Sequence, residues 1–274
     1  MNPILRTLLV LIFSLAYTFL PSQTMATKPA SAIKPDPACG SPITDSRDGR
    51  TYATVRIGTQ CWMSQNLNFG TYVPVGQTQG AEGTQKYCYG DDSSKCDIKG
   101  YGGLYEWKEM MGTSQPCNGA GAAQPTCDKP AQGICPVGWH IPSHDEYTLL
   151  EKSVGSNPNA FPYDNITRGF FGSNEGANLK STEFGPLAPS WYNGGTGPLR
   201  GTNTSGFNAL QSGAVQEGVF SGLGYFGCWL WTSSEFSETA AWRRMVYYNF
   251  AMVNRNAASK TSGISVRCIK DETH

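Results

Sequence analysis

The sequence predicts a mixed α+β domain with short helices, a small antiparallel sheet and long loops stapled by disulfide bonds. Three observations support this fold class. Glycine is abundant, with 32 of 274 residues, while only 15% of the residues are charged, a balance that favours short strands and turns over helical bundles. Nine cysteines follow an N-terminal segment typical of exported proteins. Apolar residues recur with strand or helix periodicity only over short stretches.

The N-terminal residues 1–32 have the layout of a secretory signal peptide. Arg6 precedes an apolar run over residues 8–20, and small residues suited to cleavage follow. The run is short for a bilayer span, and an uncleaved N-terminal anchor is the alternative. Residues 33–42 are rich in proline and predict a flexible spacer, with one domain over residues 43–271. We expect an extracellular, cell-surface or periplasmic protein with no membrane association after signal cleavage.

The charge balance argues against two classes of partner. The chain has 21 Lys and Arg and 21 Asp and Glu residues, so its formal net charge is zero. Such a chain has no net field to attract nucleic acid or an anionic membrane. We therefore expect neither as a partner.

The cysteines predict a disulfide framework, because an oxidising exterior favours bridges. We expect Cys88 to pair with Cys96, Cys117 with Cys127, and Cys135 with Cys268. Cys61 has two possible partners, Cys39 and Cys228, and one of these thiols is left over. The leftover thiol is either buried or free to join two chains.

The first elements of the domain are predicted from turn and alternation signals. Asp48 and Gly49 form a good hairpin turn, and residues 51–57 alternate as a half-buried strand does. This strand leads to residues 61–63 in the core. Asp45 and Asp48 form an acidic cluster that we interpret as a solvated turn rather than a calcium site.

Two helices are predicted in the central part of the chain. Residues 103–112 place Leu104, Trp107 and Met111 on one helical face, with Gly112 at the end. Residues 144–154 follow a capping box of Ser143 and Glu146. Residues 157–227 are rich in glycine, asparagine, serine and proline, and predict a long loop region whose aromatic residues pin it to the core.

The last part of the domain is predicted to be an antiparallel meander. Strands are expected over residues 228–233, 241–247 and 264–269. A turn near residues 248–251 and a return through Val253 would join them.

One known family shares a set of motifs with residues 43–271, in the same order. The motifs are DGRTYATVRIG at 48–58, GLYEW at 103–107, CPVGWHIPS at 135–143, GFNA at 206–209, WTSS at 231–234 and SVRC at 265–268. The chain thus resembles the Fibrobacter succinogenes major paralogous domain family. This family is similar to C-type-lectin-like and formylglycine-generating-enzyme-like folds, and no biochemical activity is firmly tied to it. The resemblance implies a lectin-like architecture.

No catalytic or metal site is predicted. His140, His144 and Cys135 carry zinc-binding groups, but Pro142 breaks the helical spacing that would align the imidazoles, and Cys135 is better explained as a bridge. We expect no metal and no cofactor, with His140 a hydrogen-bonded core residue and His144 exposed in the first helical turn. Formylglycine-generating enzymes use a cysteine pair, whereas only Cys228 lies in the matching half of this chain.

We interpret the chain as a non-catalytic binding module that recognises a glycan or a surface protein. Aromatic rings stack on sugars or anchor interfaces, and arginine and asparagine supply directed hydrogen bonds. The ligand is expected on a C-terminal hairpin face that comprises Trp242, Arg243, Arg244, Tyr247, Asn249, Asn254 and Arg255. The alternative is that Trp242 and Tyr248 are ordinary sheet core. Two other functions stay open, namely structural decoration of a cell-surface or pilus assembly and an oxidase of the formylglycine-generating type.

Overall fold

The structure is a computed structural model that describes residues 39–98, 100–114, 130–162, 164, 166–182, 201–222 and 227–272. The predicted signal peptide, most of the spacer and the predicted Cys117–Cys127 pair lie outside these residues.

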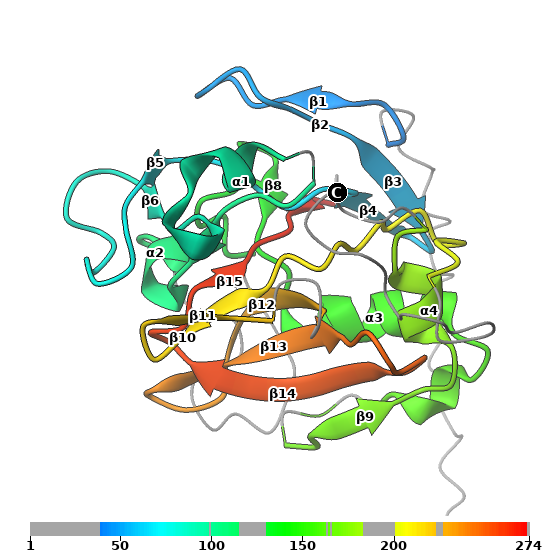
Figure 1. Cartoon of the computed structure of the whole chain (residues 1–274). Helices are drawn as coiled ribbons and strands as arrows, with labels where there is room; N and C mark the ends of the chain where they lie inside the picture. Colours follow the sequence, from blue (N-terminus) through cyan, green and yellow to red (C-terminus); the bar gives the residue numbers. More distant parts are fainter. Residues whose placement is uncertain are drawn as a thin grey trace, which may run out of the picture. The chain divides into compact units, whose positions relative to one another are not determined.

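A six-stranded sheet forms the centre of the domain (Figure 1). Its strands, in spatial order, are β7 (Leu104–Tyr105), β15 (Ile264–Ser265), β12 (Cys228–Glu235), β13 (Ala240–Val246), β14 (Val253–Ser259) and β9 (Gly169–Phe171). The strands β12, β13 and β14 form the antiparallel meander that the sequence predicts. β15 instead joins β12 in parallel, because the chain crosses over after β14 before it returns.

A four-stranded antiparallel sheet packs next to the central sheet. It contains β3 (Thr54–Ile57), β4 (Gln60–Met63), β16 (Ile269–Lys270) and β8 (Trp139–His140). The predicted C-terminal strand is therefore two strands, β15 in one sheet and β16 in the other. The segment between them crosses from sheet to sheet and carries Cys268.

Three two-stranded ribbons complete the β structure described. They pair β1 (Ile43–Thr44) with β2 (Thr51–Tyr52), β5 (Thr71–Tyr72) with β6 (Gln85–Lys86), and β10 (Ala214–Gln216) with β11 (Val219–Ser221). The predicted turn joins β1 to β2, and Gly49 has the positive φ of 75° that favours glycine there.

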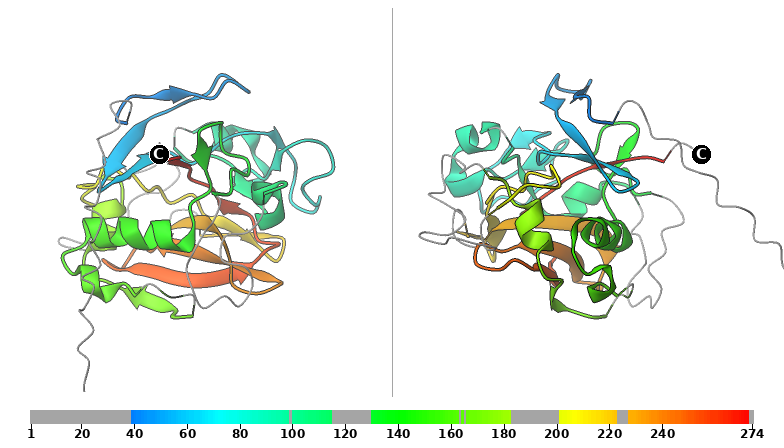
Figure 2. Two further views of the ribbon diagram at one scale, coloured as in Figure 1. Left: turned by 180° about the vertical axis from the view of Figure 1, so that it is seen from behind. Right: turned by 90° about the vertical axis from the view of Figure 1, so that its right-hand side faces the viewer.

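The longest helix described is α3 (His144–Val154), with the bounds that the sequence predicts. Ser143 Oγ accepts from the Glu146 amide, and Glu146 Oε2 accepts from the Ser143 amide, so the predicted capping box is present. The view from behind shows α3 lying along the face of β12 and β13 (Figure 2). Its Tyr147 ring packs 5.1 Å from the Trp62 ring, between the two sheets.

The remaining helices are short. They are α1 (Ser93–Asp97), α2 (Trp107–Met111), α4 (Glu175–Leu179) and the 3-10 turns η1 (Tyr89–Asp91) and η2 (Pro158–Ala160). The helix predicted over residues 103–112 starts only at Trp107, because residues 104–105 pair with β15 as β7. Gly112 ends this helix as predicted.

The region 157–227 is not a continuous loop where it is described. It contains η2, β9, α4, β10 and β11. Phe170 and Phe171 pair with the edge of β14, a tertiary contact that overrides the loop-like composition. The predicted aromatic anchoring is confirmed at Phe207, which is fully buried.

The described disulfides confirm two predicted pairs, Cys88–Cys96 and Cys135–Cys268. The partner of Cys61 is Cys39 rather than Cys228. Cys228 is the free thiol among the described cysteines, and it is buried in the core. The Cys135–Cys268 bond joins the segment before β8 to the segment before β16, which are neighbouring strands.

Candidate functional site

The predicted hairpin face is divided between the two sides of the central sheet. Trp242, Arg244 and Arg255 lie on the side of α3, where the Trp242 ring is 4.3 Å from the His144 ring. Arg243 and Asn254 lie on the opposite side, with the Arg243 guanidinium 4.1 Å above the Trp229 ring. The alternation along β13 thus separates the residues into two sets, as the sequence indicates.

Both sets are buried, so the prediction of one solvent-facing surface is wrong for most of these residues. The exposed fraction is at most 7% for Trp242, Arg243, Arg244, Asn254 and Arg255. Alternation along a strand does not indicate whether the second face of the sheet is covered as well as the first. The other two predicted residues are half-buried and lie in the turn after β13, namely Tyr247 and Asn249. That any of the seven binds a ligand stays a prediction.

His144 is enclosed by two arginines, and the prediction that it is exposed is wrong. Arg244 Nη1 lies 3.3 Å from His144 Nδ1, and Arg255 Nη2 contacts His144 Nε2. Burial, together with the two positive charges, holds the pKa of His144 well below its usual value. Arg244 Nε donates to Glu151 Oε1 at 2.5 Å, so this buried cation has a buried counter-ion. We call these four residues the sealed cluster.

His140 is buried between two carboxylates, which confirms it as a hydrogen-bonded core residue. Its Nδ1 lies 2.6 Å from Asp271 Oδ1, and its Nε2 lies 2.7 Å from Glu146 Oε1. Burial alone lowers the pKa of His140, but the carboxylates outweigh it and the pKa is raised. Since Cys135 is bonded to Cys268 and His144 faces arginines, these residues do not form the zinc site considered above.

Two hollows meet at Arg50, on the side of the domain that carries β1, β2 and α1. The first has a volume of about 390 Å³ and is lined by Asp48, Arg50, Phe69, Gly70, Thr71 and Thr84. The second is smaller, about 210 Å³, and its polar lining includes Tyr52, Gln65, Asn66, Asn68 and Asp97. Because Arg50 lines both, we call the two hollows together the Arg50 site.

Arg50 is held at this site by two acidic residues. Its Nη2 lies 2.9 Å from Asp97 Oδ1, and its Nε lies 3.4 Å from Asp48 Oδ2. The hairpin turn positions Asp48, whose Oδ1 also accepts from the Arg50 amide at 3.0 Å. The Arg50 side chain is 40% exposed, so its guanidinium is accessible from solvent.

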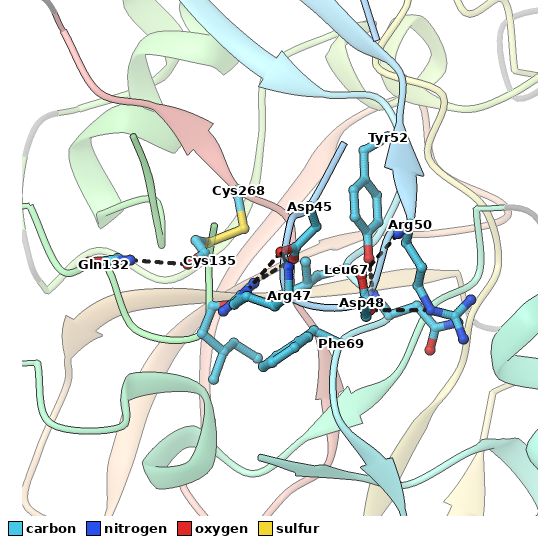
Figure 3. Close-up of polar contacts among 12 residues, drawn as sticks. Asp45, Arg47, Asp48, Arg50, Tyr52, Leu67, Phe69, Gln132, Cys135 and Cys268 are labelled. Carbon is cyan, nitrogen blue, oxygen red and sulfur yellow. Dashed lines mark hydrogen bonds and ion pairs between the residues drawn. A yellow bond between two sulfur atoms is a disulfide. The ribbon is translucent and has the colours of Figure 1, made fainter. Parts of the chain in front are cut away.

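An aromatic ring forms one wall of the first hollow. Figure 3 shows Phe69 between the pair Asp45–Arg47 and the pair Asp48–Arg50. The Arg47 guanidinium lies 3.7 Å above the Phe69 ring and fixes its orientation. Arg47 is itself anchored by Asp45, whose Oδ2 lies 2.6 Å from Nη2.

Buried polar groups form the floor beneath the second hollow. The Asn68 amide donates to Tyr52 Oη at 3.0 Å, and Asn68 Nδ2 donates to Asp97 Oδ1 at 3.0 Å. Burial raises the pKa of Tyr52 to about 12, so its hydroxyl is neutral. Burial lowers the pKa of Lys86 to about 8, and neighbouring Arg50 adds to this effect.

The Arg50 site can form many directed hydrogen bonds to a ligand. It presents a guanidinium, carboxylates, side-chain amides and hydroxyls, beside one aromatic ring. Within the described part of the chain, no three His, Cys, Asp or Glu side chains are grouped to hold a metal ion. The arrangement is therefore suited to recognition of a polar molecule.

The sequence indicates parts of this site without joining them. A turn signal identifies Asp48, but no pattern marks Arg50 as a ligand-facing residue, and none marks Phe69 or Asn68. The lining comes from segments 48–52, 65–71 and 84–102, which the parallel pairing of β5 and β6 helps to bring together. A two-residue parallel pairing leaves almost no periodic signal in a sequence.

Comparison with known families matches residues 55–270 to the Fibrobacter succinogenes major domain. The chain belongs to this family. The match covers most of the chain and confirms the resemblance that the motifs indicate. No curated protein and no solved structure matches the chain. Among the helices in the described residues, none has the length and apolar character needed to cross a membrane.

Proposed function

We propose that this member of the Fibrobacter succinogenes major domain family is an exported, non-catalytic recognition module that binds a glycan at the Arg50 site. The observation that carries the proposal is the meeting of two hollows at one accessible arginine. The three described disulfides agree with export to an oxidising compartment.

The chemistry of the lining favours a neutral, hydroxyl-rich ligand. Asp48 and Asp97 balance the positive charges of Arg50 and Lys86, so the site has little net charge to select a strongly charged ligand. A sugar ring offers both donors and acceptors to such a lining, and its apolar face can stack on a ring such as Phe69. Glycan recognition uses every type of group present.

The lectin-like architecture that the motifs imply is part of this proposal. Sheets held by disulfides would give a rigid base, while the segments around the Arg50 site are turns and short elements that can vary in shape. The second hollow lies beside the Cys88–Cys96 bond, because Cys96 lines it. The disulfide thus fixes α1, which supplies Asp97.

The two rival functions gain no specific support. A structural role through an inter-chain bridge needs a reachable thiol, whereas Cys228 is fully buried. An oxidase of the formylglycine-generating type needs a reactive thiolate, whereas burial raises the pKa of Cys228. A protein ligand on the cell surface is the closest alternative, since the same groups can bind a polar loop.

A glycan array on the purified secreted protein tests the proposal. We expect binding to at least one neutral glycan, and we expect Arg50→Ala to weaken it at least about tenfold, or about 1.4 kcal/mol. Arg56→Ala is the matched control, because Arg56 lies on neighbouring β3 and lines neither hollow. Binding that survives Arg50→Ala but is lost in Tyr247→Ala would move the ligand to the hairpin turn and contradict the Arg50 site.

A further inference from the structure

Each hollow of the Arg50 site has its own carboxylate, and the two hollows share one cation. Asp48 lines only the first hollow, and its Oδ2 lies 3.4 Å from Arg50 Nε. Asp97 lines only the second hollow, and its Oδ1 lies 2.9 Å from Arg50 Nη2. The guanidinium is therefore held between two acidic residues at the place where the hollows meet.

The first hollow is suited to a sugar ring that lies flat on an aromatic side chain. Figure 3 shows the Phe69 ring beside the Asp48–Arg50 pair, and the Arg47 guanidinium packs 3.7 Å from the centre of that ring. Because Phe69 also lines the hollow, the part of its ring that faces the hollow can stack on the apolar face of a sugar. Thr71 adds a hydroxyl group to the same lining.

The second hollow is suited to a sugar ring that is held by its hydroxyl groups. Asn68 lines this hollow, is only 6% exposed, and has an Oδ1 that accepts no hydrogen bond from the described residues. Asn68 Nδ2 donates to Asp97 Oδ1 at 3.0 Å, which fixes the orientation of the amide. A buried acceptor without a partner is costly, so a ligand hydroxyl that donates to Asn68 Oδ1 would be stabilising.

We propose that the Arg50 site binds two neighbouring sugar residues of one glycan chain, one in each hollow. This inference rests on the glycan ligand proposed above and adds the minimum length of that ligand. The sugar residue in the first hollow stacks on Phe69, and its neighbour donates hydroxyl hydrogens to Asn68 and Asp97. Arg50 Nη1, which donates to none of the described residues, binds an oxygen close to the linkage between the two sugars.

The division of the site into two hollows distinguishes this arrangement from the binding of a single sugar. The hollows have volumes of about 390 and 210 Å³, and one ring stacked on Phe69 leaves Asn68 and Asp97 unused. A second, covalently linked ring adds its contacts without a second loss of translational and rotational freedom. A disaccharide should therefore bind more tightly than either of its monosaccharides.

Variants that block one hollow at a time test the proposal. Thr71 lines only the first hollow and Thr51 only the second, and both are exposed strand residues, where a large aromatic side chain is compatible with the fold. Thr71→Trp and Thr51→Trp should each fill part of one hollow. Thr44→Trp is the matched control, because exposed Thr44 pairs with Thr51 and lines neither hollow. The probes are a glycan that binds on the array and its constituent monosaccharides and disaccharides, with Kd measured by isothermal titration calorimetry.

The affinities of the fragments separate the possible outcomes. We expect a disaccharide to bind the wild type at least about tenfold more tightly than either monosaccharide, and each blocking variant to remove that advantage. Thr44→Trp should bind as the wild type does. A monosaccharide that binds as tightly as the disaccharide, or a disaccharide whose affinity is unchanged in one blocking variant, would overturn the two-residue site but leave a glycan site at Arg50. Failure of the wild type to bind any glycan on the array would instead contradict the proposed function itself, and this inference with it.

Discussion

His140 lies in β8 and His144 at the start of α3, and both are buried, but their electrostatic surroundings are opposite. His140 contacts the carboxylates of Glu146 and Asp271, which raise its pKa. His144 contacts Arg244 and Arg255, which together with burial lower its pKa. The surroundings of His140 therefore favour the protonated imidazole, and those of His144 favour the neutral one.

The difference shows that distant chain segments decide the charge of each ring. Asp271 is 131 residues from His140, and the two arginines are 100 and 111 residues from His144. The His140 region is closed by β16 and the Cys135–Cys268 bond, whereas the His144 region is closed by the central sheet. The disulfide bond should therefore contribute most to the stability of the His140 region, and the buried ion pair most to the stability of the His144 region.

Removal of the Cys135–Cys268 bond is expected to have the largest effect on stability. In the chain-entropy model, a loop spanning this sequence separation of 133 contributes about 5 kcal/mol, whereas the loop of Cys88–Cys96 contributes about 2.5 kcal/mol. We compare two variants, each with both cysteines of one bond replaced by serine. Loss of Cys135–Cys268 should lower the free energy of unfolding by about 2.5 kcal/mol more than loss of Cys88–Cys96, as measured by urea unfolding. Equal losses would show that native-state contacts, rather than loop length, determine the contribution of each bond.

A substitution in the sealed cluster should give the next largest effect on stability. Glu151→Gln leaves the buried Arg244 without a counter-ion and should lower the free energy of unfolding by about 3–5 kcal/mol. Asp97→Asn, which breaks the exposed pair with Arg50, is the control and should cost less than about 1 kcal/mol. Urea unfolding of both variants measures the contrast. A Glu151→Gln loss as small as that of the control would mean that the buried pair is not needed for stability.

Local signals explain what the sequence could predict of the fold. The capping box of Ser143 and Glu146 indicates the start of α3 and Gly155 indicates its end, because both signals depend only on neighbouring residues. The meander β12–β13–β14 was also predictable from alternation. The start of α2 was not, since residues 104–105 are recruited as β7 by a strand from the far end of the chain.

The candidate site was harder to predict for the same reason. Alternation along β13 correctly separated Trp242 and Arg244 from Arg243, yet it could not show that both sides of the sheet are covered. Arg50 and Asn68 meet only through long-range contacts. Exposed and buried arginines look alike in a sequence, since their difference arises entirely from packing.

The dependence of the free energy of unfolding on acidic pH tests whether His144 is neutral in the folded protein. The pKa of His144 in the folded state is lowered, so below about pH 6.5 the unfolded chain binds a proton that the folded chain excludes. His144 should therefore lower the free energy of unfolding by up to about 1.4 kcal/mol for each pH unit of acidification. Asp145, whose pKa burial raises to about 7, acts in the opposite direction in the same range. The measurement is thus the difference between wild type and His144→Gln, whose stability should decline less in acid. Parallel curves would contradict a neutral His144.

An alkaline titration should show the smaller and opposite effect of His140. Its pKa is raised in the folded state, so its stabilising contribution is complete below about pH 6.5 and is lost as the pH rises through the folded-state value. His140→Gln should be less stable than wild type at pH 6 and approach it above neutrality, as measured by urea unfolding at each pH. Asp271→Asn should reduce this gap only in part, because Glu146 remains on Nε2 of the ring. A gap between His140→Gln and wild type that is constant across this range would mean that packing, rather than the two carboxylates, accounts for the contribution of His140.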